Sequence, residues 1–271
     1  MKAANTDPPI YQRSTGTIRL RFADRGGLGG IGSVYQYGAG KVRFPRRPDG
    51  VAEALVLNTS GGLAGGDRFD LAVNVDAHTA MVSTQACERV YRALDAPAVV
   101  RQEAVAASGA HLIHMPQPTL VFDGAALHRT TRVAIAEGGR RSLGEASVLG
   151  RAAMGETVRT IDLGDRTEVR LGGRLALVDA VRLQTDVLKV AATPAILGPN
   201  RAYGLIVHRD DDLEDAQARL RAALRDSGGA SIVNGLLVAR LLAPSHQALQ
   251  GVLVAAMTAL TGQAPPRAWQ L

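Results

Sequence analysis

The chain has 271 residues, 46% of them hydrophobic and 21% charged, a balance that excludes a disordered or fibrous protein. Its 30 glycines exceed the usual share of about 7% and indicate frequent turns, while aromatic residues make up only 4%. The 31 basic residues outnumber the 25 acidic ones, but the arginines are scattered, which argues against a nucleic-acid-binding protein.

Short alternating runs dominate the first 200 residues. Thr17–Phe22 alternates apolar and polar residues with period two, as a half-buried strand does, and Phe69–Val75 alternates in the same way. Similar runs recur at Ala110–Ile113, Thr119–Phe122, Thr131–Ile135, Thr167–Leu171 and Arg174–Leu183. Gly-Gly, Gly-Asp or Asp-Gly pairs separate several of these runs, so the pattern predicts a sandwich, a barrel or a layered sheet.

Two later segments follow helical spacing. The first helix is predicted near residues 210–226, with acidic residues at its start that suit the positive end of the helix dipole. The second is predicted near 245–261, with Ser245 as its N-cap, and the intervening segment Ser231–Leu242 fits a strand. With no long linker or repeat, the sequence predicts one mainly β domain over 1–271, a layered or superhelical β-sheet with two α-helices in its C-terminal half.

The sequence also indicates a compartment. Cys87 is the only cysteine, which excludes an intrachain disulfide and a cysteine zinc site. The polar N-terminal segment lacks the apolar core of a secretory signal, and the apolar stretches near 236–243 and 252–260 are too short or too interrupted to span a bilayer. We therefore expect a cytoplasmic protein with no membrane partner.

The most distinctive segment is a glycine-rich run that ends in Asp67. Its four glycines require positive φ angles or a close approach of the backbone; they are Gly61, Gly62, Gly65 and Gly66. A phosphate-binding loop needs Lys followed by Ser or Thr at its end, whereas Asp67 would repel a phosphate and an alternating run follows. Two interpretations stay open: a sharp turn that starts a strand, and a functional carboxylate held at that turn.

Histidine and cysteine residues offer weaker signals. His111 and His114 lie in an extended run, where residues three apart point to opposite faces, so a joint metal site is not expected. No nucleophile signature surrounds Cys87, and we expect it to be a buried structural cysteine.

Acidic residues elsewhere permit metal chemistry. Arg151 and Glu156 form either an exposed salt bridge or a polar pair that lines a cavity, and Glu145 and Asp179 are equally ambiguous. Carboxylate oxygens suit a hard or borderline ion, and a chain with a single thiol suits transient passage of a metal better than tight storage.

Several of these segments together resemble the urease accessory protein UreD family, also called UreH. The resemblance rests on motifs in matching order and spacing: Gly61–Asp67, Ser83–Gln85 leading into Val90-Tyr91, His114–Pro118, and Gly150-Arg151 through Gly155-Glu156. The ends agree as well, at Gly16–Phe22, Val42–Pro45 and Pro266–Trp269. The resemblance therefore covers essentially the whole chain.

The resemblance implies a β-rich, non-enzymatic protein of the cytoplasm. Family members act with the accessory protein UreF and the GTPase UreG in a complex that docks on urease apoprotein and helps to deliver nickel to its active site. Nickel would pass through an internal channel, and no cofactor would be tightly bound. The resemblance is compatible with a dimer of this chain within the complex.

The resemblance also assigns residues. Asp67 and Glu156 match acidic motif positions, and Glu145 and Asp179 fall near acidic channel positions, so all four are expected to face transient nickel without being tight ligands. Neutral oxygens along the route would come from Ser83, Thr84 and Gln85. Further motif residues are the four glycines, Tyr91 and Arg151.

Two alternatives belong to other functional classes. One is a β-rich hydrolase that uses Cys87 or a Ser/His pair, which requires a histidine within hydrogen-bond reach of Cys87 or Ser83. The other is a basic adaptor that binds nucleic acid. An acidic protein partner explains the excess of basic residues equally well.

Overall fold

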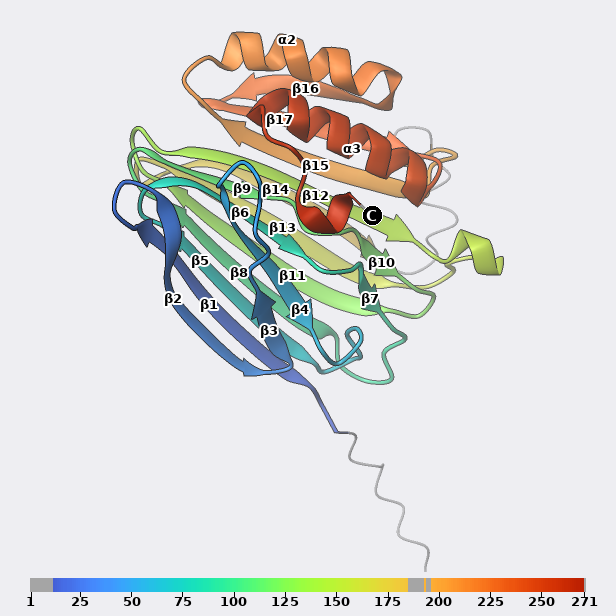
Figure 1. The fold of residues 1–271 in the computed structure, drawn as a ribbon. Helices are drawn as coiled ribbons and strands as arrows, with labels where there is room; N and C mark the ends of the chain where they lie inside the picture. The colour runs from blue at the N-terminus through green and yellow to red at the C-terminus, as the bar shows by residue number, and fades with distance from the viewer. Residues whose placement is uncertain (1–11, 185–192, 194–195, 271) are drawn as a thin grey trace, which may run out of the picture.

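A computed structural model describes residues 12–184, 193 and 196–270, and in this part of the chain the strands form two sheets (Figure 1). The seven-stranded sheet has the order β14 (Arg174–Gln184), β13 (Asp162–Leu171), β11 (Ala126–Ile135), β8 (Ala98–Ala106), β5 (Arg68–Val75), β1 (Thr15–Asp24) and β2 (Gly29–Gly38). The ten-stranded sheet has the order β16 (Gly228–Val233), β17 (Leu236–Ala243), β15 (Ala202–Arg209), β12 (Arg140–Leu149), β9 (Ala110–His114), β6 (His78–Thr84), β4 (Ala52–Asn58) and β3 (Gly40–Arg43). Its remaining strands are β10 (Thr119–Val121), which pairs with β12, and β7 (Glu88–Val90), which pairs with β10.

The chain alternates between the two sheets as it advances. From β4 to β13 the long strands fall in turn into the ten-stranded and the seven-stranded sheet, and neighbours such as β5 and β8, or β6 and β9, are parallel. This winding confirms the predicted fold class, a mainly β protein with layered sheets and two helices in its C-terminal half.

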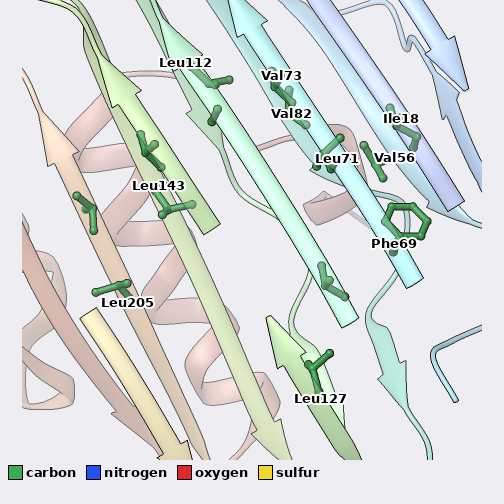
Figure 2. Close-up of a cluster of buried hydrophobic side chains, with 14 of the residues drawn as sticks. Ile18, Val56, Phe69, Leu71, Val73, Val82, Leu112, Leu127, Leu143 and Leu205 are labelled. Carbon is green, nitrogen blue, oxygen red and sulfur yellow. The ribbon is translucent and has the colours of Figure 1, made fainter. Parts of the chain in front are cut away.

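Two apolar cores follow from this arrangement. The larger one lies between the sheets, where side chains such as Leu71, Leu127 and Leu143 meet (Figure 2). The second lies between the ten-stranded sheet and the helices, with Leu253 and Met257 of a helix packed on that sheet. Because β12 lies in the middle of both cores, nine of its ten residues are buried, and its sequence shows no alternation.

The helices α2 (Leu213–Leu224) and α3 (His246–Thr261) cover the outer face of the ten-stranded sheet (Figure 1). Both predicted helices are confirmed. The Ser245 side chain accepts a hydrogen bond from the backbone N–H of Ala248 at 3.2 Å, and Gly262 ends α3 in the left-handed region with φ of 64°. In the described part of the chain, neither helix is long and apolar enough to cross a membrane.

One expectation needs correction. Ser231–Leu242 is not one strand but the two antiparallel strands β16 and β17, joined by Asn234-Gly235. Both turn residues have positive φ, 48° and 77°, which is the geometry that Asn-Gly favours in a two-residue hairpin. Short 3₁₀ segments complete the structure at Ala152–Met154 (η1), Arg225–Ser227 (η2) and Arg267–Trp269 (η3).

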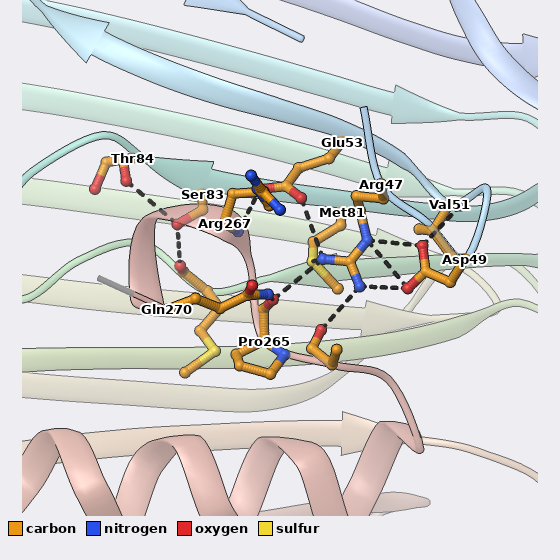
Figure 3. A network of polar contacts seen from close by, with 12 residues as sticks. Arg47, Asp49, Val51, Glu53, Met81, Ser83, Thr84, Pro265, Arg267 and Gln270 are labelled. Atoms are coloured by element: carbon orange, nitrogen blue, oxygen red, sulfur yellow. Dashed lines mark hydrogen bonds and ion pairs between the residues drawn. The ribbon is translucent and has the colours of Figure 1, made fainter. Parts of the chain in front are cut away.

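The C-terminal segment is held against the ten-stranded sheet by a buried polar network (Figure 3). Arg47 is buried, and its Nη1 donates to the carbonyl of Pro265 and pairs with Glu53, each at 3.1 Å. Farther along, the Trp269 indole N–H donates to the carbonyl of Met115 at 2.9 Å. These contacts bring the end of the chain beside β4, β6 and β9.

Candidate functional site

The glycine-rich segment is a turn that Asp67 closes. One carboxylate oxygen of Asp67 accepts the backbone N–H of Ser14 at 2.7 Å, and the other accepts that of Ala64 at 2.8 Å. The carboxylate is buried and fully engaged, so Asp67 fixes the turn to the start of β1. Gly62 has φ of 145°, and a side chain there would lie 2.5 Å from the ring of Tyr91.

A cavity of about 200 Å³ lies between the sheets next to this turn. Gly61 and Gly62 form part of its wall, and side chains of both sheets line it. Its polar lining residues are unusual in an otherwise apolar core; they include Glu88, Gln102, His114, Thr119, Arg129 and Glu145.

Glu145 is one of the residues that line this cavity. It lies in the middle of β12 on the face that turns toward the seven-stranded sheet, as Leu143 does. Its Oε1 is buried and, among the residues described, has no hydrogen-bond partner. Burial raises the pKa of Glu145, and the nearby guanidinium of Arg129 counteracts that shift. A partner-free buried carboxylate oxygen is a group that water or a cation would satisfy.

Arg129 joins the two sheets beside Glu145. Its guanidinium makes a bidentate pair with Asp165 on the neighbouring strand, at 2.9 and 2.5 Å. Its Nη1 also donates to the Thr119 hydroxyl of the opposite sheet at 3.1 Å. Although burial alone would lower its pKa, the charges of Asp165 and Glu145 raise the pKa of Arg129.

A second, smaller cavity of about 20 Å³ continues beyond Arg129. Arg129 and Glu145 line both cavities, and the second one is also lined by Asp165, Asp179 and Tyr203. Asp179 pairs with Arg240 of the opposite sheet. Burial raises the pKa of Asp179, against the effect of Arg240. The two cavities thus share a polar wall between the sheets, and we refer to them together as the polar region.

Two further ionisable groups face this region. Glu88 lines the larger cavity, accepts a hydrogen bond from the Asn58 amide at 3.2 Å, and has its pKa raised to about 7 by burial. Arg141 is fully buried on β12, and its Nη2 lies 3.2 Å from Nδ1 of His114. Burial lowers the pKa of Arg141 to about 9, although Glu145 opposes that shift.

Comparisons with known proteins identify the family of this chain. The profile of the family described as "UreD urease accessory protein" matches residues 14–270. Proteins named urease accessory protein UreD from Chelativorans sp. (strain BNC1), Rhizobium leguminosarum bv. viciae and Paracoccus denitrificans are 36%, 38% and 39% identical to this chain. The alignments cover 98%, 99% and 97% of this chain and 98%, 98% and 95% of those proteins.

The chain belongs to the UreD family. Membership supports a role in urease maturation and confirms the resemblance seen in the sequence. The family name describes an accessory protein, which agrees with a non-catalytic role.

The structure separates the four acidic residues that the resemblance assigned to a nickel path. Glu145 and Asp179 line the cavities between the sheets. Asp67 closes the glycine-rich turn, and Glu156 lines a hollow on the surface instead. In the described ranges, no group of three or more His, Cys, Asp and Glu side chains is arranged to hold a metal ion.

The neutral motif residues are also divided. Thr84 and Gln85 line the larger cavity. Ser83 is fully buried, and its hydroxyl donates to the carbonyl of Met115 at 2.7 Å. Thr84 Oγ1 accepts the backbone N–H of Gln117 at 2.8 Å, which ties β6 to the segment after β9.

Sequence reasoning missed Arg129 and Asp165. A signal was present, because the apolar residues Leu127, Val133 and Ile135 define the inward face of β11, and Arg129 shares their phase. The predicted strand started at Thr131 and so did not include Arg129.

The two histidines point to opposite faces of β9, as predicted. His111 faces the helices, where its Nε2 lies 2.9 Å from the Ser142 hydroxyl, and that hydroxyl lies 2.9 Å from Nδ1 of His208. His114 faces the other sheet and contacts Arg141. The opposite orientations follow from the extended backbone.

The cysteine lies nearer to a histidine than the sequence could show. Cys87 is half-buried rather than buried, and its Sγ lies 3.9 Å from Nε2 of His246 at the start of α3. Burial raises the pKa of the Cys87 thiol and lowers that of His246. Both shifts disfavour the thiolate–imidazolium pair that a cysteine hydrolase requires, so the contact does not support that alternative.

Proposed function

We propose that this chain is a non-enzymatic chaperone that binds urease apoprotein and, with UreF and UreG, delivers nickel to the urease active site. It would act in the cytoplasm, with nickel as its transient cargo. The observation that carries the proposal is the polar region between the sheets, which Glu145 lines together with Arg129.

The chemistry of this region suits a divalent cation in transit. Moving an ion into a protein interior is very unfavourable unless charges of opposite sign compensate for the lost hydration. Glu88 and Glu145 supply carboxylates in the larger cavity, and Asp179 supplies one in the smaller cavity. Oxygen ligands hold nickel more loosely than thiolates do, which favours release over storage.

Arg129 gives this path a barrier. A cation that moves from the larger to the smaller cavity would pass beside its guanidinium, since Arg129 and Glu145 line both. A metal ion at the free oxygen of Glu145 would repel that guanidinium and compete with it for Asp165. This competition would make passage depend on the arrival of a divalent ion.

The test is nickel loading of urease with Glu145→Gln. The chain is expressed with the urease subunits, UreF and UreG of its host, and the complex is purified before bound nickel and urease activity are measured. The substitution keeps the shape of the side chain, so we expect unchanged assembly and a nickel content at least several-fold lower. The matched control is Glu103→Gln, the same change at an exposed position on β8.

Each result bears on a different part of the proposal. If Glu145→Gln loads nickel as well as the unaltered chain does, the path between the sheets is wrong. If the unaltered chain binds none of the maturation proteins, the chaperone role itself is contradicted.

A further inference from the structure

A second polar feature lies on the surface, apart from the cavities between the sheets. It is a hollow of about 580 Å³ lined by Tyr91, Arg92, Phe122, Asp123, Arg151, Arg159 and their neighbours, and we name it the arginine hollow. It takes in motif residues, Tyr91, Arg151 and Glu156, that the proposed nickel path does not use.

The floor of the arginine hollow is held in place by its own contacts. The guanidinium of Arg151 lies over the ring of Phe122, 4.3 Å from its centroid. Tyr91 meets the same ring edge-on, with centroids 5.5 Å apart. Glu156 holds Arg151 in place, because its carboxylate accepts hydrogen bonds from the Nε and from the backbone N–H of Arg151, each at 2.9 Å. Little side-chain freedom would be lost on binding a partner, because these groups are already ordered.

The charges in the hollow favour an anionic partner. Three arginines, Arg92, Arg151 and Arg159, face two carboxylates. Asp123 accepts the backbone N–H groups of Arg159 and Thr160 at 2.7 and 3.0 Å, and these bonds lower its pKa.

Each carboxylate accepts backbone N–H groups and also pairs with an arginine, Glu156 with Arg151 at 2.9 Å and Asp123 with Arg92 at 3.3 Å, yet the cations remain accessible. The Arg92 and Arg151 side chains are 66% and 47% exposed. Arg159 is exposed as well. A positive charge is left over in the hollow, and it lies where a partner can reach it.

The residue types match those that dominate protein–protein interfaces. Arginine and tyrosine are over-represented among the residues that contribute most to binding. Two large apolar side chains lie in the segments that border the hollow, Leu94 at 68% exposure and Met154 at 75%. The mixture of paired charges and apolar groups suits a protein surface better than a polyanionic phosphate backbone.

The arginine hollow is also joined to the wall of the larger cavity. The Tyr91 hydroxyl donates to the carbonyl of Gly61 at 3.2 Å, and its ring lies against Gly62. Both glycines line the cavity between the sheets. A partner seated on Tyr91 would therefore lie next to that cavity.

We infer that the arginine hollow is the docking surface for an acidic segment of a protein partner, one that carries Asp or Glu side chains onto Arg92 and Arg159. The inference rests on the proposed function, since the partner is then one of the urease maturation proteins. Docking there places the partner beside the proposed nickel path.

The first test reverses charge in the hollow. Arg92→Glu/Arg159→Glu is compared with the control Arg101→Glu, on the outer face of the seven-stranded sheet, where Arg101 is 60% exposed and lies 4.0 Å from Asp70. Each chain is expressed with the urease subunits, UreF and UreG of its host, and the retained partners are quantified at low and high salt. We expect the double variant to retain at least tenfold less of one partner than the unaltered chain does, and the control to retain as much. High salt should weaken the unaltered complex.

The second test leaves every charge intact. A photo-crosslinking residue is placed at Met154, and, as a control, at Leu28 in the β1–β2 hairpin, at the far end of the sandwich from β7 and β10 (Figure 1). We expect the probe at Met154 to capture a peptide rich in Asp and Glu from one maturation protein, and the probe at Leu28 to capture none.

The outcomes are distinguishable. If the unaltered chain and the double variant retain every partner equally, and Met154 crosslinks to none, the docking surface is refuted while the proposed function stands. Charge-dependent retention on DNA-cellulose without any crosslinked protein would also refute it, in favour of nucleic acid. If the unaltered chain retains no maturation protein, the proposed function fails, and the docking inference fails with it.

Discussion

Removing Arg129 should destabilise this protein more than removing any exposed arginine. In Arg129→Met, the carboxylate of Asp165 loses both of its bidentate contacts and stays between the sheets, since the Arg129 and Asp165 side chains are only 8% and 12% exposed. Thr119 also loses the donor that reaches it from the other sheet. Breaking a buried pair by removing one partner costs about 3–5 kcal/mol. That is a large fraction of the roughly 5–15 kcal/mol by which a native protein is stable.

The measurement is urea denaturation of the full chain, with a double-mutant cycle. Arg129→Met/Asp165→Leu removes both charges, and we expect it to recover at least 2 kcal/mol of the loss, because no buried charge is left unpaired. The exposed control is Arg166→Met, which removes a pair with Glu168 at 2.7 Å and should cost at most about 1 kcal/mol. The reasoning is refuted if Arg129→Met costs no more than Arg166→Met, or if the double variant is as unstable as the single one.

Two further predictions concern the wall of the larger cavity. Because burial raises the pKa of Glu88 from 4.5 to about 7, the folded state holds a proton that the unfolded state releases, and stability should fall as pH rises between those values. Glu88→Gln should abolish a decrease of about 3 kcal/mol over this range, seen as the difference between the two proteins in urea denaturation at several pH values; parallel curves would contradict it. Gly62→Ala should cost about 1–3 kcal/mol, because its φ is 145° and the new Cβ would lie 2.7 Å from the carbonyl of Arg89. Gly61→Ala also has positive φ but meets no atom within 4 Å, so equal losses in the two alanine variants would show that the close approach is unimportant.

Much of the fold was predictable because its signals are local. Strands with one solvated face, such as β1 and β5, alternate in sequence as they do in burial. The helices carry their own caps, as at Ser245. The central strands β12 and β15 were not predicted. Both of their faces are buried, so their sequences do not alternate between apolar and polar residues.

The candidate site was less predictable because its contacts join distant segments. Asp67 is adjacent in sequence to the glycines, but its role is set by Ser14, which lies 53 residues earlier. The sequence alone leaves Glu145 ambiguous, and only the resemblance to a family assigns it a role; its free oxygen follows from how the two sheets meet. The inward phase of Arg129 could be inferred from β11 alone, whereas its contact with Thr119 could not.

Burying charged side chains between the sheets opposes folding, so the stability of the fold does not explain why these residues are present. Taking an ion out of water costs several kcal/mol even after relaxation, and well-packed apolar residues in place of a buried pair are often neutral or stabilising. Glu145 and Arg141 flank the core residue Leu143 on β12. Burial raises the pKa of Glu145 and lowers that of Arg141, so in both side chains it favours the neutral form. The contacts of β12 do not account for the carboxylate of Glu145, whose Oε1 has no hydrogen-bond partner among the residues described. The proposed nickel path supplies a reason for the Glu145 carboxylate, because a dehydrated divalent ion needs a carboxylate without a partner, and an apolar core would exclude that ion. Glu145, whose burial weakens the sandwich, is therefore the residue on which the proposed transfer depends.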